Sequence, residues 1–272
     1  MSNTSASLPE TSALLDVMAK LRDPESGCPW DIAQSFETIS PYTIEEAYEV
    51  ADAIDRCDMQ SLREELGDLL LQVVFHSQIA QDQGLFKFED VAQGIANKMI
   101  ERHPHVFGDL EFDSIEEQKA HWESLKALAR EKKRTRDSDS AASAIDDVAQ
   151  ALPALIRAEK IQKRASRVGF DWAELSPVLG KVHEELNEFT EAVNANNQFE
   201  MEDELGDLLF SVVNVARHAN VDPEQALKKS TAKFERRFRK VEQALKDDGL
   251  EMTDSTMEVL DRYWEKSKQS GG

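Results

Sequence analysis

The six residues ELGDLL occur twice in this chain of 272 residues, at residues 65–70 and again at residues 204–209. A cluster of three glutamates precedes each copy, and the two clusters have the same separation along the chain as the two copies. We call this separation the repeat offset; it relates Glu65 to Glu204 and Glu46 to Glu185. Aromatic-Asp pairs, Trp30-Asp31 and Phe170-Asp171, lie upstream of the two clusters. Such self-similarity indicates that one structural unit of roughly 110 residues is present twice.

The repeated segments have helical spacing. Apolar residues after the first cluster follow the i, i+3, i+4, i+7, i+8 pattern of an amphipathic helix. Gly and Pro are few, at 11 and 8 residues, and alternating strand patterns are scarce. We predict an all-α fold with a first helical domain at 11–129, a flexible polar linker at 130–144 and a second helical domain at 145–269. Residues 1–10 and the final SGG are expected to be disordered tails.

Composition limits the classes of partner. The formal net charge is -21, and so acidic a surface repels a phosphate backbone, which argues against general nucleic-acid binding. We interpret the basic cluster at 132–136 as part of a solvated linker rather than as a nucleic-acid patch. The chain has no apolar run of the ~18 residues that a membrane span needs, and its first residues are not expected to act as a secretion signal. The two cysteines match no paired motif, so free thiols and a cytoplasmic location are expected.

The acidic residues of each unit are placed to meet. Glu184, Glu185 and Glu188 have the spacing of one helix face, and Glu204 and Asp207 are three apart on the next predicted helix. Two such helices packed antiparallel bring four or five carboxylates together, and like charges at that range need a counter-charge. Oxygen ligands without histidine or thiol beside them favour Mg²⁺, with Mn²⁺ as a substitute.

Other interpretations of the acids fit the sequence less well. A solvated acidic helix face is the main alternative, but drift after duplication would scatter its charges. A di-iron bundle requires Glu-x-x-His, and none of the six histidines has a glutamate three residues before it. Glycine-rich phosphate loops and H-E-x-x-H are absent from the sequence. Gly206, which costs ~1 kcal/mol relative to Ala inside a helix, predicts a close approach of helices at that point.

The pattern EExxE, followed sixteen residues later by ExxD on the next helix, resembles the signature of the MazG family of all-α nucleoside triphosphate pyrophosphohydrolases. CPWD, RHPHVFGD, VGFDW and KFERRF are similar to the two-domain bacterial form. The resemblance implies two MazG-type units, each forming four-helix-bundle-like sites in a homodimer. It also implies Mg-dependent hydrolysis of nucleoside triphosphates to monophosphate and pyrophosphate, with water attack at the α-phosphorus, in nucleotide-pool house-cleaning. The metal ligands it implies are Glu46, Glu49, Glu65 and Asp68 in the first unit and Glu185, Glu188, Glu204 and Asp207 in the second.

Further roles follow from this resemblance. Glu184 or Glu185 is the candidate for accepting the proton of the attacking water. Phosphate-facing cations are expected on one helical stretch, with a solvated basic helix as the alternative. Trp264 is expected to stack on a base, with a packing tryptophan as the alternative. The expected phosphate-facing cations are Lys233, Arg236 and Arg237, and the expected nucleotide-binding residues are Lys181, Glu184, Lys233, Arg237, Trp264 and Lys268.

Two predictions concern the units as a whole. The second unit is expected to carry most of the activity, because Glu101 of the first unit aligns with Arg236 when Lys98 is matched to Lys233. A non-catalytic nucleotide sensor is the alternative function, which the intact acids of both units disfavour. A homodimer is expected because an apolar helix face needs burial. That face consists of Leu208, Leu209, Val212 and Val213.

Overall fold

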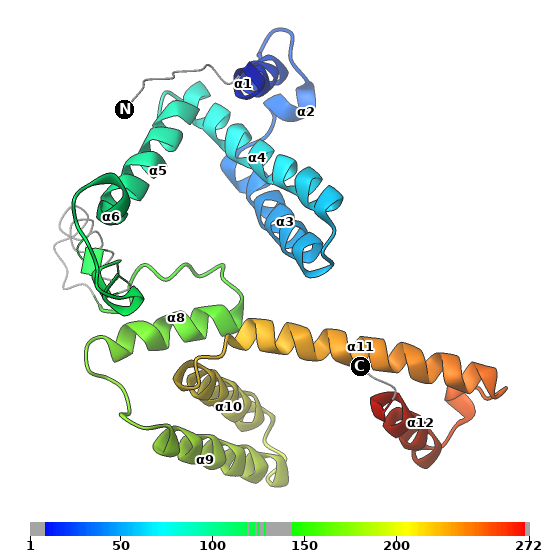
Figure 1. The fold of residues 1–272 in the computed structure, drawn as a ribbon. Coiled ribbons are helices and arrows are strands. Elements are labelled where there is room, and N and C mark those ends of the chain that lie inside the picture. Colours follow the sequence, from blue (N-terminus) through cyan, green and yellow to red (C-terminus); the bar gives the residue numbers. More distant parts are fainter. Residues whose placement is uncertain (1–8, 119, 123, 126–127, 129–142, 270–272) are drawn as a thin grey trace. The chain divides into compact units, whose positions relative to one another are not determined.

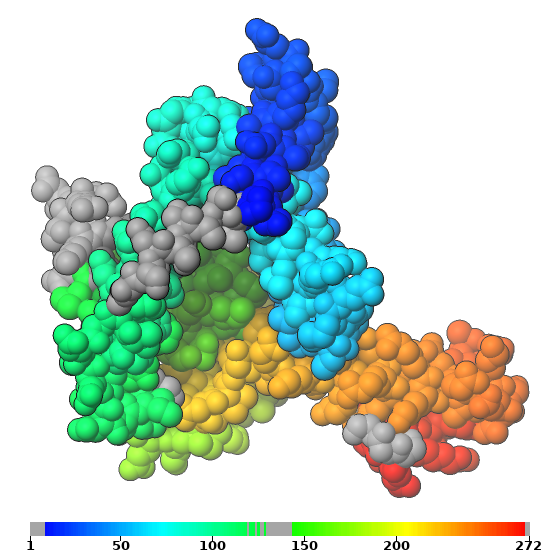
Figure 2. All heavy atoms as spheres, turned by 45° about the horizontal axis from the view of Figure 1, so that its top comes forward, coloured from blue at the N-terminus to red at the C-terminus, as the bar shows by residue number. Residues whose placement is uncertain are grey.

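The computed structural model describes residues 9–118, 120–122, 124–125, 128 and 143–269 (Figure 1). These residues form helices and no strand, which confirms the all-α prediction. The chain divides into two compact units, Met1–Lys133 and Arg134–Gly272. The expected linker at 130–144 lies outside the described residues except for its last two, and so do most residues of the expected tails. Figure 2 draws all heavy atoms, with the residues outside this description in grey.

The first unit is built around a pair of long helices, α3 and α4, which pack against each other. Helices α1 and α5 also pack on α4. Their buried side chains, among them Met18, Ile39 and Ile79, form one core from α1, α3 and α4. The elements are α1 (Pro9–Leu21), α2 (Pro29–Ile32), α3 (Phe36–Asp55), α4 (Met59–Asp82), α5 (Phe88–Arg102) and α6 (Pro104–Phe107).

The second unit repeats the long pair as α9 and α10, and α8 packs on α10. Helix α11 contacts α8 and α12, and a small core of Val241, Leu245 and Tyr263 joins α11 to α12. The elements are α8 (Ala154–Ser166), α9 (Leu175–Asn194), α10 (Gln198–His218), α11 (Pro223–Asp247), the 3₁₀ turn η1 (Met252–Asp254) and α12 (Met257–Gln269).

The turn inside each long helix pair is the same in both units. Cys57 and Asn196, which are related by the repeat offset, both have a left-handed backbone, with φ of 55° and 53°. The next residue caps the second helix of the pair: the Asp58 side chain accepts a hydrogen bond from the Ser61 amide, and Asn197 accepts one from the Glu200 amide. A short turn with this geometry reverses the chain, so each acidic helix folds back on the next.

One expectation about apolar contacts was wrong, and a second is confirmed for only part of the predicted face. A side chain added at Gly206 would meet nothing within 4 Å, so the chain itself makes no close approach there. Residue 206 lies about 200° around the helix from Glu204, on the side away from α9. In the predicted apolar face, Leu209 and Val212 are exposed, Leu208 is half-buried, and Val213 is buried within its own unit.

Two further expectations can be compared with the structure. Cys28 and Cys57 are both free thiols, as expected. Among the described residues, no helix combines the length and the apolar character needed to cross a membrane.

Candidate functional site

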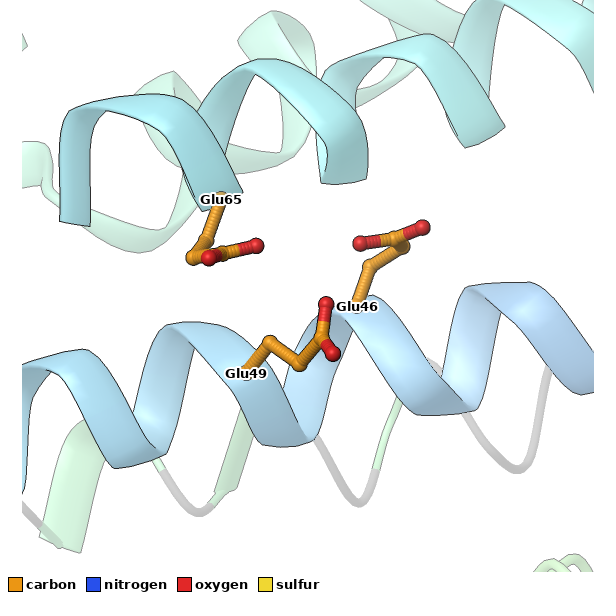
Figure 3. Close-up of side chains that lie close together, drawn as sticks. All are labelled: Glu46, Glu49 and Glu65. Atoms are coloured by element: carbon orange, nitrogen blue, oxygen red, sulfur yellow. The ribbon is translucent and has the colours of Figure 1, made fainter. Parts of the chain in front are cut away.

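The first acidic cluster lies between α3 and α4 (Figure 3). Glu46 and Glu49 project from α3 and Glu65 from α4, into the space between the two helices. One oxygen from each carboxylate lies within 4.8 Å of the others. The pKa of Glu46 is raised by desolvation and then by the charges of Asp68 and Glu49, so the fourth predicted ligand also acts on this site. The pKa of Glu65 is raised by desolvation and by repulsion from Glu49.

The second cluster lies between α9 and α10. Oxygens of Glu185, Glu204 and Asp207 lie within 4.8 Å of one another, and Glu185 is buried. The pKa of Glu204 is raised by desolvation and then by the charge of Glu188. The pKa of Glu188 is itself raised, by desolvation and by Glu185. Three predicted ligands of each unit therefore share one space, and the fourth, Asp68 or Glu188, acts on it through its charge. A divalent cation with a preference for oxygen ligands fits such a cluster.

A lysine gives the second cluster a positive charge. Lys181 Nζ lies 2.6 Å from Glu185 Oε1 and 2.9 Å from Glu184 Oε1. Hydrogen bonds to Glu185 and then to Glu184 raise the pKa of Lys181 above its ordinary range. At the position related to Lys181 by the repeat offset, the first unit has Tyr42. The two units thus differ in the residue at this position of the first acidic helix.

A cavity of about 450 Å³ adjoins the second cluster. It lies among α8, α9, α10 and the segment before α9, and its size is in the range of small-molecule sites. Its surface is mainly apolar. The lining residues at its acidic end include Lys181, Glu185 and Asp207, and those of its apolar walls include Ile161, Phe170, Trp172, Val178 and Phe210.

One wall of the cavity is held by an ionic network. Arg217 Nη1 donates to Asp171 Oδ2 at 2.8 Å, and His218 Nε2 lies 3.0 Å from Asp171 Oδ1. The hydrogen bond from Arg217 and then the one from His218 lower the pKa of Asp171 to about 2. Asp171 belongs to the aromatic-Asp pair that the sequence repeats, and its role here is to fix the segment that carries Phe170 and Trp172.

The family comparison covers both clusters. The model of the MazG nucleotide pyrophosphohydrolase domain matches residues 34–107 and 176–242, and these two regions contain all eight predicted metal ligands. This chain belongs to the MazG family. The matched regions also include α9, α10 and most of α11, so the family assignment and the geometry refer to the same helices.

Full-length relatives support the assignment. The chain is 50% identical over 258 residues to the nucleoside triphosphate pyrophosphohydrolase of Escherichia coli K12, covering 94% of this chain and 96% of that protein. It is 48% identical over 255 residues to the nucleoside triphosphate pyrophosphohydrolase/pyrophosphatase MazG of Thermotoga maritima, covering 94% of each. It is also 42% identical over 262 residues to the uncharacterized protein YabN of Bacillus subtilis, of which it covers 52%.

The remaining predicted residues of this MazG protein lie on α11 and α12. Lys233, Arg236 and Arg237 are on α11, and no hydrogen bond or ion pair within the described residues joins them to the acids. The Trp264 ring lies 5.1 Å from that of Phe234 and is packed at the α11–α12 core. Packing is thus the role that the structure describes for Trp264, and stacking on a base stays a prediction. Lys268 forms an ion pair with Glu265, and its contact with phosphate is likewise a prediction.

Two histidines of the first unit have structural surroundings. His76 stacks on Phe36 at 5.9 Å and bonds Thr43 through Nε2 at 3.1 Å, and burial lowers its pKa. His103 Nδ1 lies 2.7 Å from the Met99 carbonyl oxygen.

The cavity beside the second cluster was not predicted from the sequence. The repeated aromatic-Asp pair was the one sequence signal that pointed to it.

Proposed function

We propose that the chain hydrolyses nucleoside triphosphates to monophosphate and pyrophosphate with Mg²⁺ or Mn²⁺, and that the second unit is the main site. The observation that carries this proposal is that Lys181, Glu185 and Asp207 belong both to the acidic cluster and to the wall of the cavity. A nucleotide whose base enters the cavity would have its phosphates at the acids. The names of the full-length relatives, as nucleoside triphosphate pyrophosphohydrolases, support the same activity.

The mechanism follows from this arrangement. A bound Mg²⁺ would supply charge neutralisation for the phosphate oxygens and a water of lowered pKa. Glu185, Glu204 and Asp207 hold their oxygens at ligand spacing, with Glu188 beside them. Lys181 offers a positive charge where the cavity meets the acids, and so opposes the negative charge of a triphosphate. Glu184 is exposed beside Lys181 and is the carboxylate we assign to accept the proton of the attacking water.

The same positions in the first unit argue for a lesser role. Tyr42 takes the place of Lys181, and buried Phe75 takes the place of the cavity residue Asn214. Phe75 is part of the core of the first unit, so its ring fills space that a base would need. The first unit keeps the acids, but at these two positions it has aromatic residues in place of the cation and the small polar residue.

A homodimer is part of this proposal. Three apolar positions on the second helix of each pair are exposed, and the repeat offset relates the three of one unit to the three of the other. Their spacing of i, i+4 and i+7 places them on one face of the helix, which suits helix packing between two chains. These positions are Leu66, Leu70 and Val73 in α4 and Leu205, Leu209 and Val212 in α10.

The test is product analysis with a panel of nucleoside triphosphates. We expect monophosphate and pyrophosphate in equal amounts, with activity lost in EDTA and restored by Mg²⁺ or Mn²⁺. Release of diphosphate and orthophosphate, or full activity in EDTA, would contradict the proposal. Tight nucleotide binding without pyrophosphate release would instead identify a nucleotide sensor.

A further inference from the structure

The cavity contains a buried amide group that the proposed hydrolysis does not use. We propose that Gln162 makes the second unit select bases that carry an amino group on the edge opposite the sugar. Cytosine and adenine nucleotides are then preferred over uracil and hypoxanthine nucleotides. This inference rests on the proposed function for one point only, the placement of the phosphates at the acids.

Gln162 lies on α8 and has a fixed amide orientation. Its Nε2 donates to the Phe210 carbonyl oxygen at 2.8 Å, so its Oε1 is the atom left to interact elsewhere. The residue is only 7% exposed, and Oε1 is buried without a hydrogen-bond partner among the described residues. Gln162 also lines the cavity. A buried carbonyl oxygen without a partner is costly, and a ligand N–H entering the cavity would satisfy it.

Asn214 supplies the complementary group. It lies on α10 one turn after Phe210, on the same face, and lines the same cavity. Its Oδ1 accepts hydrogen bonds from Arg217 Nε at 3.0 Å and Arg217 Nη2 at 2.8 Å. Because the oxygen is engaged in this way, the group that Asn214 can offer to a ligand is its NH₂. The cavity therefore presents an acceptor from α8 and a donor from α10.

This pair of groups distinguishes bases by their outer edge. When the phosphates lie at the acidic cluster, the base points into the cavity. The edge of the base that lies opposite the sugar then reaches deepest. Cytosine and adenine present an amino donor beside a ring-nitrogen acceptor on that edge, which matches Gln162 Oε1 and the Asn214 amide. Uracil and hypoxanthine present a carbonyl beside a ring N–H, which places acceptor against acceptor and donor against donor.

The experiment compares matched substrates on the full-length protein. CTP and UTP differ only at this edge, as do ATP and inosine triphosphate. We expect kcat/KM for the amino member of each pair to exceed that for the keto member by about tenfold or more, a difference of about 1.4 kcal/mol or more. In Gln162→Met, which keeps the length and loses the acceptor, the ratio should fall below about threefold, through loss of activity on CTP and ATP. A ratio taken on one preparation does not depend on how much of the variant is folded.

A control and a binding measurement complete the test. Gln72→Met is the matched control, because Gln72 is equally buried at 7%, also has an unpartnered Oε1, and lies on α4 of the other unit. It should leave both ratios unchanged. Titration calorimetry with CMP and UMP in Mg²⁺ should show the same preference without turnover. Equal kcat/KM and equal affinity in the wild type, or a preference that survives in Gln162→Met, would overturn the inference. If no substrate releases pyrophosphate, the proposed function is refuted but the inference about Gln162 is not. The affinities for CMP and UMP then test the inference by themselves. If neither nucleotide binds, the inference is overturned as well.

Discussion

Replacing Lys181 by Met removes the positive charge that faces the second acidic cluster. The Glu185 side chain is 5% exposed and Lys181 is 37% exposed, and their charged atoms are 2.6 Å apart. Removing one partner of a fully buried ion pair costs about 3–5 kcal/mol. Solvent reaches Lys181, so screening reduces this value, and we expect a loss of about 1–2 kcal/mol in the free energy of unfolding. For a unit of this size that corresponds to a Tm lower by about 3–8 °C.

The loss of stability in Lys181→Met should depend on whether a divalent cation is bound. In the wild type, a divalent cation competes with Lys181 for Glu185, whereas in Lys181→Met it meets an uncompensated carboxylate. Mg²⁺ should therefore raise the Tm of the variant more than that of the wild type. The pKa of Lys181 is raised, so its stabilising effect is fully present below the ordinary value of 10.5 and is lost only as pH rises through the folded value. Measurements at neutral pH report the intact ion pair.

Calorimetry of the full-length protein with EDTA and with saturating Mg²⁺ measures both effects. Tyr42→Met is the matched control, since Tyr42 occupies the same position beside the first cluster without a charge. Its effect on Tm should be the same with and without metal. An unchanged Tm in Lys181→Met in EDTA, or a deficit of the same size in Mg²⁺ and in EDTA, would show that Lys181 does not act as the counter-charge of the acids.

Three further predictions follow from the site and the exposed faces. Glu188→Gln should remove most pyrophosphate release and Glu49→Gln should leave much of it, and the opposite result in the same assay would assign activity to the first unit. Asp171→Asn should destabilise the second unit by about 2 kcal/mol at neutral pH, because Arg217 then loses its carboxylate partner and keeps only its bonds to neutral groups. The pKa of Asp171 is lowered to about 2, so the stabilisation by its charge is present above the ordinary value of 3.8 and is lost as pH falls toward 2. If the wild type is still more stable than Asp171→Asn by the same amount at pH 2, the ionised carboxylate is not the source of the stabilisation. Leu209→Lys should convert a dimer to a chain of 30.7 kDa in light scattering, and an unchanged mass would place the dimer interface elsewhere.

Much of the site could be predicted because its geometry is local. Acids at i, i+3 and i+4 share a face on any α-helix, and a short turn with a capping residue folds that face onto the next helix. The positions of Glu46, Glu49 and Glu65 follow from these two rules. The duplication added the observation that the same rules apply twice, and in each unit the structure brings oxygens of three predicted ligands within 4.8 Å of one another.

The sequence by itself determined the helical class, the doubled unit and the membership of the acidic clusters, because each depends on periodicity and short connections. Only the tertiary structure decided which side chains are buried around them. Gln162 meets Phe210 from 48 residues away, and Arg217 meets Asp171 from 46 residues away. Such contacts depend on how α8 and the segment before α9 pack on α10. Periodicity gives the face on which a residue lies, but burial depends on what covers that face, and for this reason Val213 is interior and Gln162 lines a cavity.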